Sequence, residues 1–263
     1  MPQQTDTSEQ PTRDLNWPAC YNARDLGGYA TSNGGQTRWH ALVRTDNHFS
    51  LTPEGQAALR DYGIRTVIDL RMPRELESHP NPFAAHQTDP TAPRYFSRTV
   101  MDQDDHEADA AMQASASMLD EYIVIVERNK PRISDAVKAV ASSLSEGGVV
   151  VHCRGGKDRT GILIALLLSV AGVPRDLIVE DYAVSSPNLE PIHQRWMEEQ
   201  AQAQGHPVYR PRWMDSHPET MQGTLDYLDH TYGGPESFLL SIGVTPEEIA
   251  LIRRYLVEPA PIL

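Results

Sequence analysis

The sequence predicts an α/β fold, in which a central mixed sheet is flanked by helices and the C-terminal third is helical. Two observations support this prediction. Short, β-branched apolar runs are typical of buried strands, and the clearest are Thr66–Ile68 and Val149–Val151. Longer segments with helical spacing lie between the strand-like runs, and after residue 218 only helical patterns remain.

Turn and cap residues indicate the order of the elements. Strands are expected at residues 37–44, 65–70, 95–100 and 149–152, and helices at 55–62, 108–128, 132–144, 160–171 and 174–184. Thr52 and Pro53 start the first helix, because threonine caps a helix N-terminus and proline suits its first position. Proline and polar residues indicate loops at 78–93 and 205–218.

Length and composition indicate one globular domain. The 263 residues suffice for a sizeable core, and 40% hydrophobic with 22% charged residues is ordinary for a soluble protein. We expect a polar, disordered lead-in at residues 1–15 and a single domain at 16–263. No apolar run reaches the roughly 18–20 residues that a membrane-spanning helix needs. The N-terminal stretch resembles neither a secretory signal nor a transit peptide.

Charge and cysteine content exclude several classes of function. The net charge of −13 argues against bulk nucleic-acid binding, which needs a basic face, but permits a small anionic substrate held by local charge. The two cysteines, Cys20 and Cys153, form neither a disulfide framework nor a C-x-x-C metal motif. We therefore expect no metal and no cofactor. A reactive thiol needs a reducing location, which favours the cytoplasm over export without a recognised signal.

One segment, His152–Gly161, places a thiol, two glycines and an arginine between a strand and a helix. Cys153 stands at the front of the predicted loop and Arg159 at its end. Such a loop can point several N–H groups at one centre, and the positive N-terminal end of the following helix favours an anion there. The same charges favour the thiolate form of the cysteine. The pattern therefore predicts attack by sulfur on a phosphate ester.

Each residue of the loop has an expected role. Cys153 is the nucleophile, and Arg159 grips two phosphate oxygens with its planar guanidinium. Gly155 and Gly156 let the chain curl into a cup without steric cost. Loop amides and the arginine supply the charge neutralisation that phosphoryl transfer needs, without a metal. The expected phosphate-binding residues are Arg154, Gly155, Gly156, Lys157, Asp158 and Arg159.

Two neighbours of the loop are expected to support it. Thr160 donates its hydroxyl to the sulfur and helps the cysteine leave in the second step. His152 orders the loop backbone rather than acting as a base, because a thiolate that is already formed needs none. An inert buried cysteine would not explain why glycines and an arginine coincide with it. The segment does not match the phosphate-binding motif of nucleotide triphosphatases, because Val151 stands where that motif has its first glycine and Asp158 where it has Ser or Thr.

The run His-Cys-x-x-Gly-Lys-Asp-Arg-Thr-Gly resembles the signature loop of the cysteine-dependent protein tyrosine phosphatases. It is most similar to their atypical bacterial and fungal branch of dual- and triple-specificity enzymes. Further segments resemble landmarks of that branch in the same order, namely Asn22–Tyr29, Leu42–Asp46, Thr66–Arg71, Tyr232–Gly234 and Ile242–Thr245. The resemblance implies a metal-independent phosphatase that acts on phosphotyrosine, and also on phosphoserine, phosphothreonine or phosphoinositides, through a cysteinyl-phosphate intermediate.

The proton donor for the leaving group stays open between several aspartates. Asp158 resembles the family's loop aspartate and is the first candidate, although it alternatively neutralises Lys157 or Arg24. Asp69 is the second, because it ends a strand at the edge where α/β active sites collect. Further candidates, with less support, are Asp102, Asp104, Asp105 and the Asp215 of Trp213-Met214-Asp215.

Lys157 and residues 110–118 each have two interpretations. A lysine in the cup suits phosphoinositides, to which the resemblance links it, or it only balances Asp158. Arg71 and Arg74 add further positive charge near the cup. Residues 110–118 form either an ordinary helix or a mobile lid over the cup, which the resemblance implies for this stretch.

Two other classes of protein remain as alternatives. A non-catalytic phosphobinding module would use the cup to hold a phosphorylated partner, but such proteins usually lose the cysteine or the arginine. A thiol enzyme of rhodanese or arsenate-reductase type also uses a cysteine in an anion-binding loop, yet the Lys-Asp-Arg-Thr-Gly ending argues against it. The expected partner is a phosphorylated protein or phosphoinositide substrate.

Overall fold

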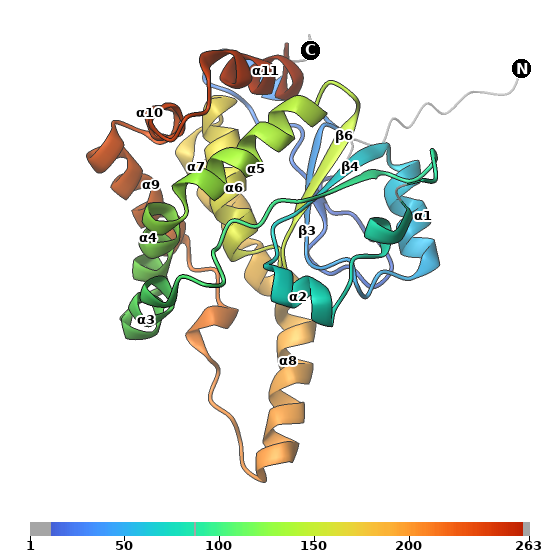
Figure 1. The fold of residues 1–263 in the computed structure, drawn as a ribbon, viewed down its shortest axis with the longest axis vertical. Coiled ribbons are helices and arrows are strands. Elements are labelled where there is room, and N and C mark those ends of the chain that lie inside the picture. The colour runs from blue at the N-terminus through green and yellow to red at the C-terminus, as the bar shows by residue number, and fades with distance from the viewer. Residues whose placement is uncertain (1–11, 87, 260–263) are drawn as a thin grey trace, which may run out of the picture.

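A computed structural model describes residues 12–86 and 88–259. Its centre is a five-stranded sheet in the order β1-β3-β6-β4-β5 (Figure 1). These strands are β1 Arg24–Asp25, β3 Leu42–Thr45, β6 Gly148–His152, β4 Ile64–Asp69 and β5 Arg94–Ser97. β3, β6, β4 and β5 run parallel, whereas β1 is antiparallel to β3. The predicted mixed sheet is confirmed, and its parallel strands end along one common edge.

Helices flank this sheet, and those from α7 onward make the C-terminal third helical, as predicted. The helices are α1 Pro53–Asp61, α2 Pro73–Ser78, α3 His106–Ala114, α4 Met118–Arg128, α5 Lys130–Ser143, α6 Asp158–Val170, α7 Arg175–Ala183, α8 Ser185–Gln204, α9 Pro218–Tyr232, α10 Pro235–Ser241 and α11 Pro246–Leu256. Two 3₁₀ helices are η1 Pro82–His86 and η2 Arg212–Met214, and a small second sheet pairs β2 Gly35–Thr37 with β7 Val257–Pro259.

Side chains that alternate along β6 divide the core into two clusters. Val149 and Val151 belong to the larger cluster, which α4 to α7 and α9 to α11 cover. Val150 points to the opposite face, where it joins Leu59 of α1 and Trp17. Helix α6 lies inside the larger cluster with 10 of its 13 residues buried, which explains its continuous apolar sequence. This packing holds the start of α6 firmly against the end of β6.

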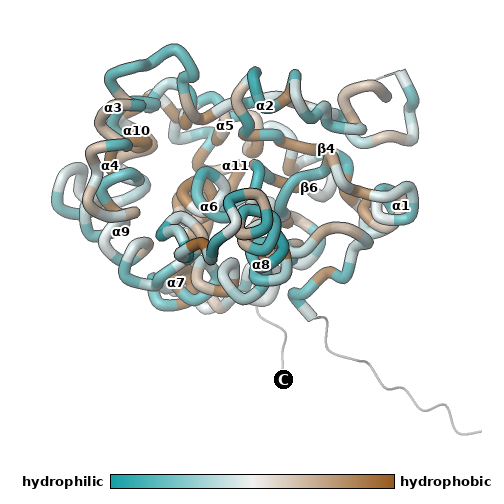
Figure 2. Tube along the Cα trace, turned by 90° about the horizontal axis from the view of Figure 1, so that it is seen from below, coloured by the Kyte–Doolittle hydropathy of each residue, from teal (hydrophilic) through white to brown (hydrophobic). Residues whose placement is uncertain are grey.

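Helix α8 extends beyond the body of the protein at the edge where the parallel strands end (Figure 1). Seen from below, it projects toward the viewer beside α6 (Figure 2). Its buried residues are Ser185, Leu189 and His193, so only its first half packs against the body. Within the described residues, no helix is long and apolar enough to cross a membrane.

The structure corrects several expected elements. Residues 108–128 form two helices, because Ser117 and Asp120 make a capping box that starts α4. Residues 37–44 contain the end of β2, a turn and most of β3 rather than one strand. The helix expected to end near Val184 is followed directly by α8, and the sequence patterns predict neither α8 nor the short α2.

Residues 12–15, expected to lie in a disordered lead-in, are ordered beside β1. The guanidinium of Arg13 lies 3.7 Å from the centre of the Tyr29 ring and donates to the carbonyl of Gly27 at 2.9 Å. These contacts fix the segment, and they correct the expected boundary of the lead-in. The rest of the lead-in, residues 1–11, lies outside the described residues.

Candidate active site

The loop Cys153–Lys157 joins β6 to α6 at the carboxyl edge of the sheet. Cys153 is 2% exposed at the end of β6, which β3 and β4 flank. Helix α6 begins at Asp158, so Arg159 stands in its first turn. The strand, loop and helix expected around the cysteine are therefore confirmed.

The backbone N–H groups of the loop find no acceptor among the residues that the structure describes. In residues 12–86 and 88–259, no hydrogen bond is donated by the backbone N–H of Arg154, Gly155, Gly156 or Lys157. The carbonyls of the loop, in contrast, are occupied, and Asn22 Nδ2 donates to those of Gly155 and Gly156 at 3.0 and 3.3 Å. Successive unpaired N–H groups beside a helix N-terminus form a ready anion-binding site.

Only one of the two loop glycines needs to be glycine. Gly156 has φ +63°, and a Cβ there would lie 2.0 Å from the carbonyl oxygen of Thr45. Gly155 has no positive φ, and its Cβ would make an ordinary contact of 3.6 Å with Leu189. The expectation that both glycines supply unusual backbone angles is therefore wrong for Gly155.

We expect Gly156→Ala to disrupt the loop and Gly155→Ala to be tolerated. The left-handed conformation costs alanine about 1–2 kcal/mol, and the clash with Thr45 must also be relieved by moving the backbone. Thermal unfolding and phosphatase assays of both variants test this expectation. A Gly156→Ala protein as stable and active as the Gly155→Ala protein would contradict it.

A buried ion network supports the loop from beneath. Arg44 donates to the carbonyl of Gly156 at 2.6 Å and pairs with Asp181 at 2.5 Å. Arg24 pairs with the other oxygen of Asp181 at 2.8 Å and donates to Asn22 Oδ1 at 2.6 Å. All of these side chains are almost fully buried. The network ties β1, β3 and α7 to the loop, and reasoning from the residues alone missed this role of Asn22, Arg44 and Asp181.

Arg159 is held by a carboxylate that the sequence analysis did not single out. Both Arg159 Nη atoms donate to Glu75 of α2, with Nη2 at 3.0 Å from Oε1. Burial lowers the pKa of Arg159, but Cys153 and Glu75 outweigh it and raise that pKa above its ordinary value. Glu75 takes one hydrogen from each Nη atom, and among the described residues the Nε–H of Arg159 has no acceptor, so this side of the guanidinium keeps donors for an anion.

Asp158 is the first residue of α6, directly after the loop, and its side chain is 34% exposed. Its Oδ1 accepts a hydrogen bond from the Tyr122 hydroxyl at 2.6 Å and lies 3.1 Å from Lys157 Nζ. Burial and the charge of Asp158 raise the pKa of Tyr122 well above its ordinary value, so this hydroxyl stays a donor. Both contacts fall on one oxygen, and Oδ2 of Asp158 makes no hydrogen bond among the described residues.

Asp69 is fully buried among partners. It pairs with Arg71 at 2.8 Å and accepts from Asn81 at 3.1 Å, and the His152 ring lies 3.3 Å away. Burial alone would raise the pKa of Asp69, but His152 and Arg71 outweigh it and hold that pKa well below its usual range. A carboxylate held ionised in this way is a poor proton donor.

The ammonium group of Lys157 is engaged by two backbone carbonyls and by Asp158. Its Nζ donates to the carbonyls of Trp213 and Asp215 at 2.6 and 2.7 Å, and the residue is 2% exposed. The side chain of Lys157 therefore fastens the η2 segment to the loop and pairs with Asp158, so of the groups expected to bind phosphate only its backbone N–H is left unengaged among the described residues. The Asp215 carboxylate pairs with Arg210.

His152 and Thr160, the two residues expected to support the loop, are both buried. His152 Nδ1 lies 3.0 Å from the carbonyl of Cys153, and its ring stacks on His48 with centroids 3.9 Å apart. The hydroxyl of Thr160 is buried and has no hydrogen-bond partner within the described part of the chain. The hydroxyl therefore makes no hydrogen bond to the Cys153 sulfur in this structure, and its expected donation to that sulfur stays a prediction.

The acidic run before α3 makes contacts at the protein surface. Asp102 pairs with Arg132 at 2.8 Å, and Asp105 pairs with Arg128 at 2.8 Å and caps α3. Residues 110–118, the segment proposed as a lid, contain the end of α3 and the start of α4. The lid remains a prediction.

Comparisons with known proteins agree with this geometry. A model of the tyrosine phosphatase family matches residues 15–258. The chain is 31% identical to a tyrosine-protein phosphatase of Nostoc commune over 220 residues, which cover 81% of this chain and 73% of the relative. It is 30% identical to the triple specificity protein phosphatase PtpB of Mycobacterium tuberculosis over 272 residues, covering 90% and 96% of the two chains. The chain thus belongs to the tyrosine phosphatase family, and it is a protein-tyrosine phosphatase.

Proposed function

We propose that the protein hydrolyses phosphotyrosine esters through a cysteinyl-phosphate intermediate, with Cys153 as nucleophile and Asp158 as proton donor. The observation that carries this proposal is the row of four N–H groups from Arg154 to Lys157, which directly follow a buried cysteine and have no acceptor among the described residues. Arg159 adds a guanidinium to the same site. Amides and arginine together stabilise the charge of a transferring phosphoryl group.

The reaction has two steps. In the first, the Cys153 thiolate bonds to phosphorus, the bond from phosphorus to the tyrosine oxygen breaks, and Asp158 gives its proton to that oxygen. In the second, Asp158 takes a proton from water, the water oxygen bonds to phosphorus, and the sulfur leaves as thiolate. The unpaired hydroxyl of Thr160 donates to the sulfur as negative charge returns to it.

Exposure favours Asp158 over Asp69 as the proton donor. Asp158 is part-exposed beside Arg159, and its Oδ2 makes no hydrogen bond within the described part of the chain, whereas Asp69 is buried in ion pairs. Asp69 then serves the site indirectly, because it holds Arg71 and lies against His152, whose ring contacts the Cys153 carbonyl. We assign Asp69 a positioning role.

We expect Asp158→Asn to slow hydrolysis of phosphotyrosine by about 10²-fold or more, because the leaving oxygen loses its proton donor. The loss should shrink for aryl phosphates whose leaving groups are more acidic and need no proton. Asp102→Asn, which alters an exposed carboxylate at the surface, is the matched control and should change neither rate. An equal loss for every leaving group would rule out proton donation by Asp158.

The substrate class is tested by phosphate release without metal from a phosphotyrosine peptide, a phosphoserine peptide and phosphoinositides, with Cys153→Ser as control. We expect cysteine-dependent release, fastest from phosphotyrosine. A free ammonium group of Lys157 would favour phosphoinositides as main substrate, because it could bind an additional phosphate. Two carbonyls engage this group, so Lys157 does not support that alternative. Cys153 and Arg159 are both in place, which opposes a non-catalytic phosphobinding module. No release from any substrate would overturn the proposed function.

A further inference from the structure

A second hollow lies directly beside the phosphate cup. It has a volume of about 270 Å³, and its lining residues are Phe49, Arg71, Arg74, Glu75, Ser78, His79 and Arg154. Two of these residues connect it to the cup, because Arg154 follows Cys153 in the chain and Glu75 pairs with Arg159. A substrate whose phosphate enters the cup therefore has neighbouring groups within reach of this hollow.

The hollow carries uncompensated positive charge. The charge of Arg71 is balanced by Asp69, and the charge of Glu75 is balanced by Arg159. The guanidinium groups of Arg74 and Arg154 are exposed, and among the described residues neither makes an ion pair or a side-chain hydrogen bond. Two free guanidiniums therefore line one small hollow, which favours an anionic group between them.

An aromatic surface forms part of the same hollow. The ring of Phe49 is 37% exposed, and the His79 ring lies against it with centroids 4.6 Å apart. The guanidinium carbon of Arg71 lies 5.9 Å from the Phe49 ring centre. A side chain with an apolar stem and an anionic end fits such a lining, because the stem covers the ring while the charge meets the arginines.

We propose that this hollow binds an acidic side chain of a phosphopeptide, next to the phosphotyrosine in the cup. The proposal rests on the proposed function. Aspartate and glutamate match the lining, since a carboxylate accepts two parallel hydrogen bonds from one guanidinium. The net charge of −13 favours a single acidic side chain over an anionic membrane surface, which the whole protein would repel.

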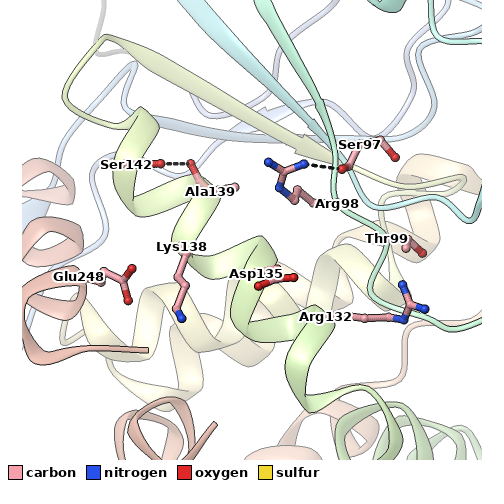
Figure 3. A pocket seen from close by; sticks show the side chains of 9 residues that line it. All are labelled: Ser97, Arg98, Thr99, Arg132, Asp135, Lys138, Ala139, Ser142 and Glu248. Carbon is pink, nitrogen blue, oxygen red and sulfur yellow. Dashed lines mark hydrogen bonds between the residues drawn. The ribbon is translucent and has the colours of Figure 1, made fainter. Parts of the chain in front are cut away.

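A larger hollow elsewhere in the protein does not have an excess of positive charge. It has a volume of about 620 Å³ between α5, the segment after β5 and the start of α11 (Figure 3). Its lining mixes both signs of charge, because Arg98 and Lys138 are accompanied by Asp135 and Glu248. None of its lining residues belongs to the cup or to the hollow beside it. Arg98 is therefore a suitable control for removing one arginine from the surface.

The test compares kcat/KM for phosphotyrosine peptides that are identical except for aspartate or alanine at one flanking position, scanned over two residues on each side. For the wild-type enzyme we expect a preference of about 2- to 5-fold for aspartate at one position, as ion pairs near a surface provide. The preference should reside in KM and should fade at high salt, which screens such pairs. Arg74→Gln and Arg154→Gln should each reduce the aspartate-to-alanine ratio toward one, and Arg98→Gln should leave it unchanged.

Charge reversal sharpens the result. Arg74→Glu should invert the ratio, so that a lysine at the same flanking position becomes preferred to aspartate. Failure of the proposed function would appear as no cysteine-dependent hydrolysis of any peptide. Hydrolysis with equal rates for aspartate and alanine at every position would overturn the subsite alone. A phosphoinositide preference that Arg74→Gln removes, without any effect on peptides, would also overturn it.

Discussion

Replacing Cys153 by serine should abolish turnover while the protein still folds and binds phosphate. The serine hydroxyl is a far weaker nucleophile than a thiolate, so kcat should fall by about 10⁴-fold or more, as for other enzymes that lose their nucleophile. The N–H groups of the loop and Arg159 do not depend on the sulfur. Phosphate release and binding of inorganic phosphate, measured on the same preparation, check both parts of the expectation.

Cys20→Ser is the matched control for this experiment. The Cys20 thiol donates to Asp46 at 2.8 Å, and both side chains are buried. Burial and the nearby Asp46 raise the pKa of Cys20 well above its ordinary value, so it stays a protonated thiol. A serine can make the same hydrogen bond, and we expect Cys20→Ser to keep its turnover. Residual turnover in Cys153→Ser that matches Cys20→Ser would mean that the nucleophile is a different group.

Replacing Asp181 by asparagine should destabilise the protein by about 3–5 kcal/mol, because it leaves two buried guanidiniums without their shared counter-charge. Arg24 and Arg44 would repel each other, and Arg44 would lose the partner that aims it at the Gly156 carbonyl. Urea unfolding at pH 7 measures this loss. Asp226→Asn is the control, since its pair with Arg175 is exposed and should contribute less than about 1 kcal/mol.

The contribution of Asp181 to the free energy of unfolding should decrease as the pH falls. Burial works to raise the pKa of Asp181, but Arg24 and Arg44 lower it to about 2 in the folded protein. In the unfolded chain an aspartate titrates near 3.9. Its contribution to stability is therefore complete above about pH 5 and is lost as the pH falls from there toward 2. The difference in unfolding free energy between wild type and Asp181→Asn should shrink over that range, and a constant difference would contradict this account.

Features that depend on neighbouring residues in the chain were predictable from the sequence. The spacing of Cys153 and Arg159, the apolar run before them and the apolar helix after them identify the strand, loop and helix without any tertiary information. The N-cap role of Thr52 is equally local, and its side chain accepts from the N–H of Gly55 as such a cap should.

Contacts between distant segments were not predictable in this way. Glu75 lies 84 positions before Arg159 in the chain, and no local pattern marks it as that arginine's partner. Lys157 stands in the loop, yet its direction is set by the carbonyls of Trp213 in η2 and of Asp215 just after it, a contact that follows only from tertiary packing. Asp181 occupies an ordinary position on α7, so its role under the loop appears only once Arg24 and Arg44 meet there. Asn22, Arg24 and Arg44 do have a signal, because they lie in segments that resemble family landmarks.

The arrangement around Arg159 gives the site a preset geometry. Glu75 holds both Nη atoms of the arginine, and Glu75 in turn accepts from the N–H of Met72 at the start of α2. The guanidinium is thus fixed in plane before substrate arrives, which limits the reorganisation needed when phosphate binds. Lys157 fixes the other side of the loop by fastening η2 to it.

The most direct test of the central claim is to trap the phosphorylated enzyme. Wild-type protein is mixed with an aryl phosphate that has an acidic leaving group, and the reaction is quenched rapidly in denaturant. The protein is then digested, and the masses of its peptides are measured by mass spectrometry. We predict one phosphoryl group on the peptide that contains Cys153, formed at the rate of the product burst and absent from Cys153→Ser. Turnover without a phosphoryl group on Cys153, or with one on another residue, would contradict the mechanism.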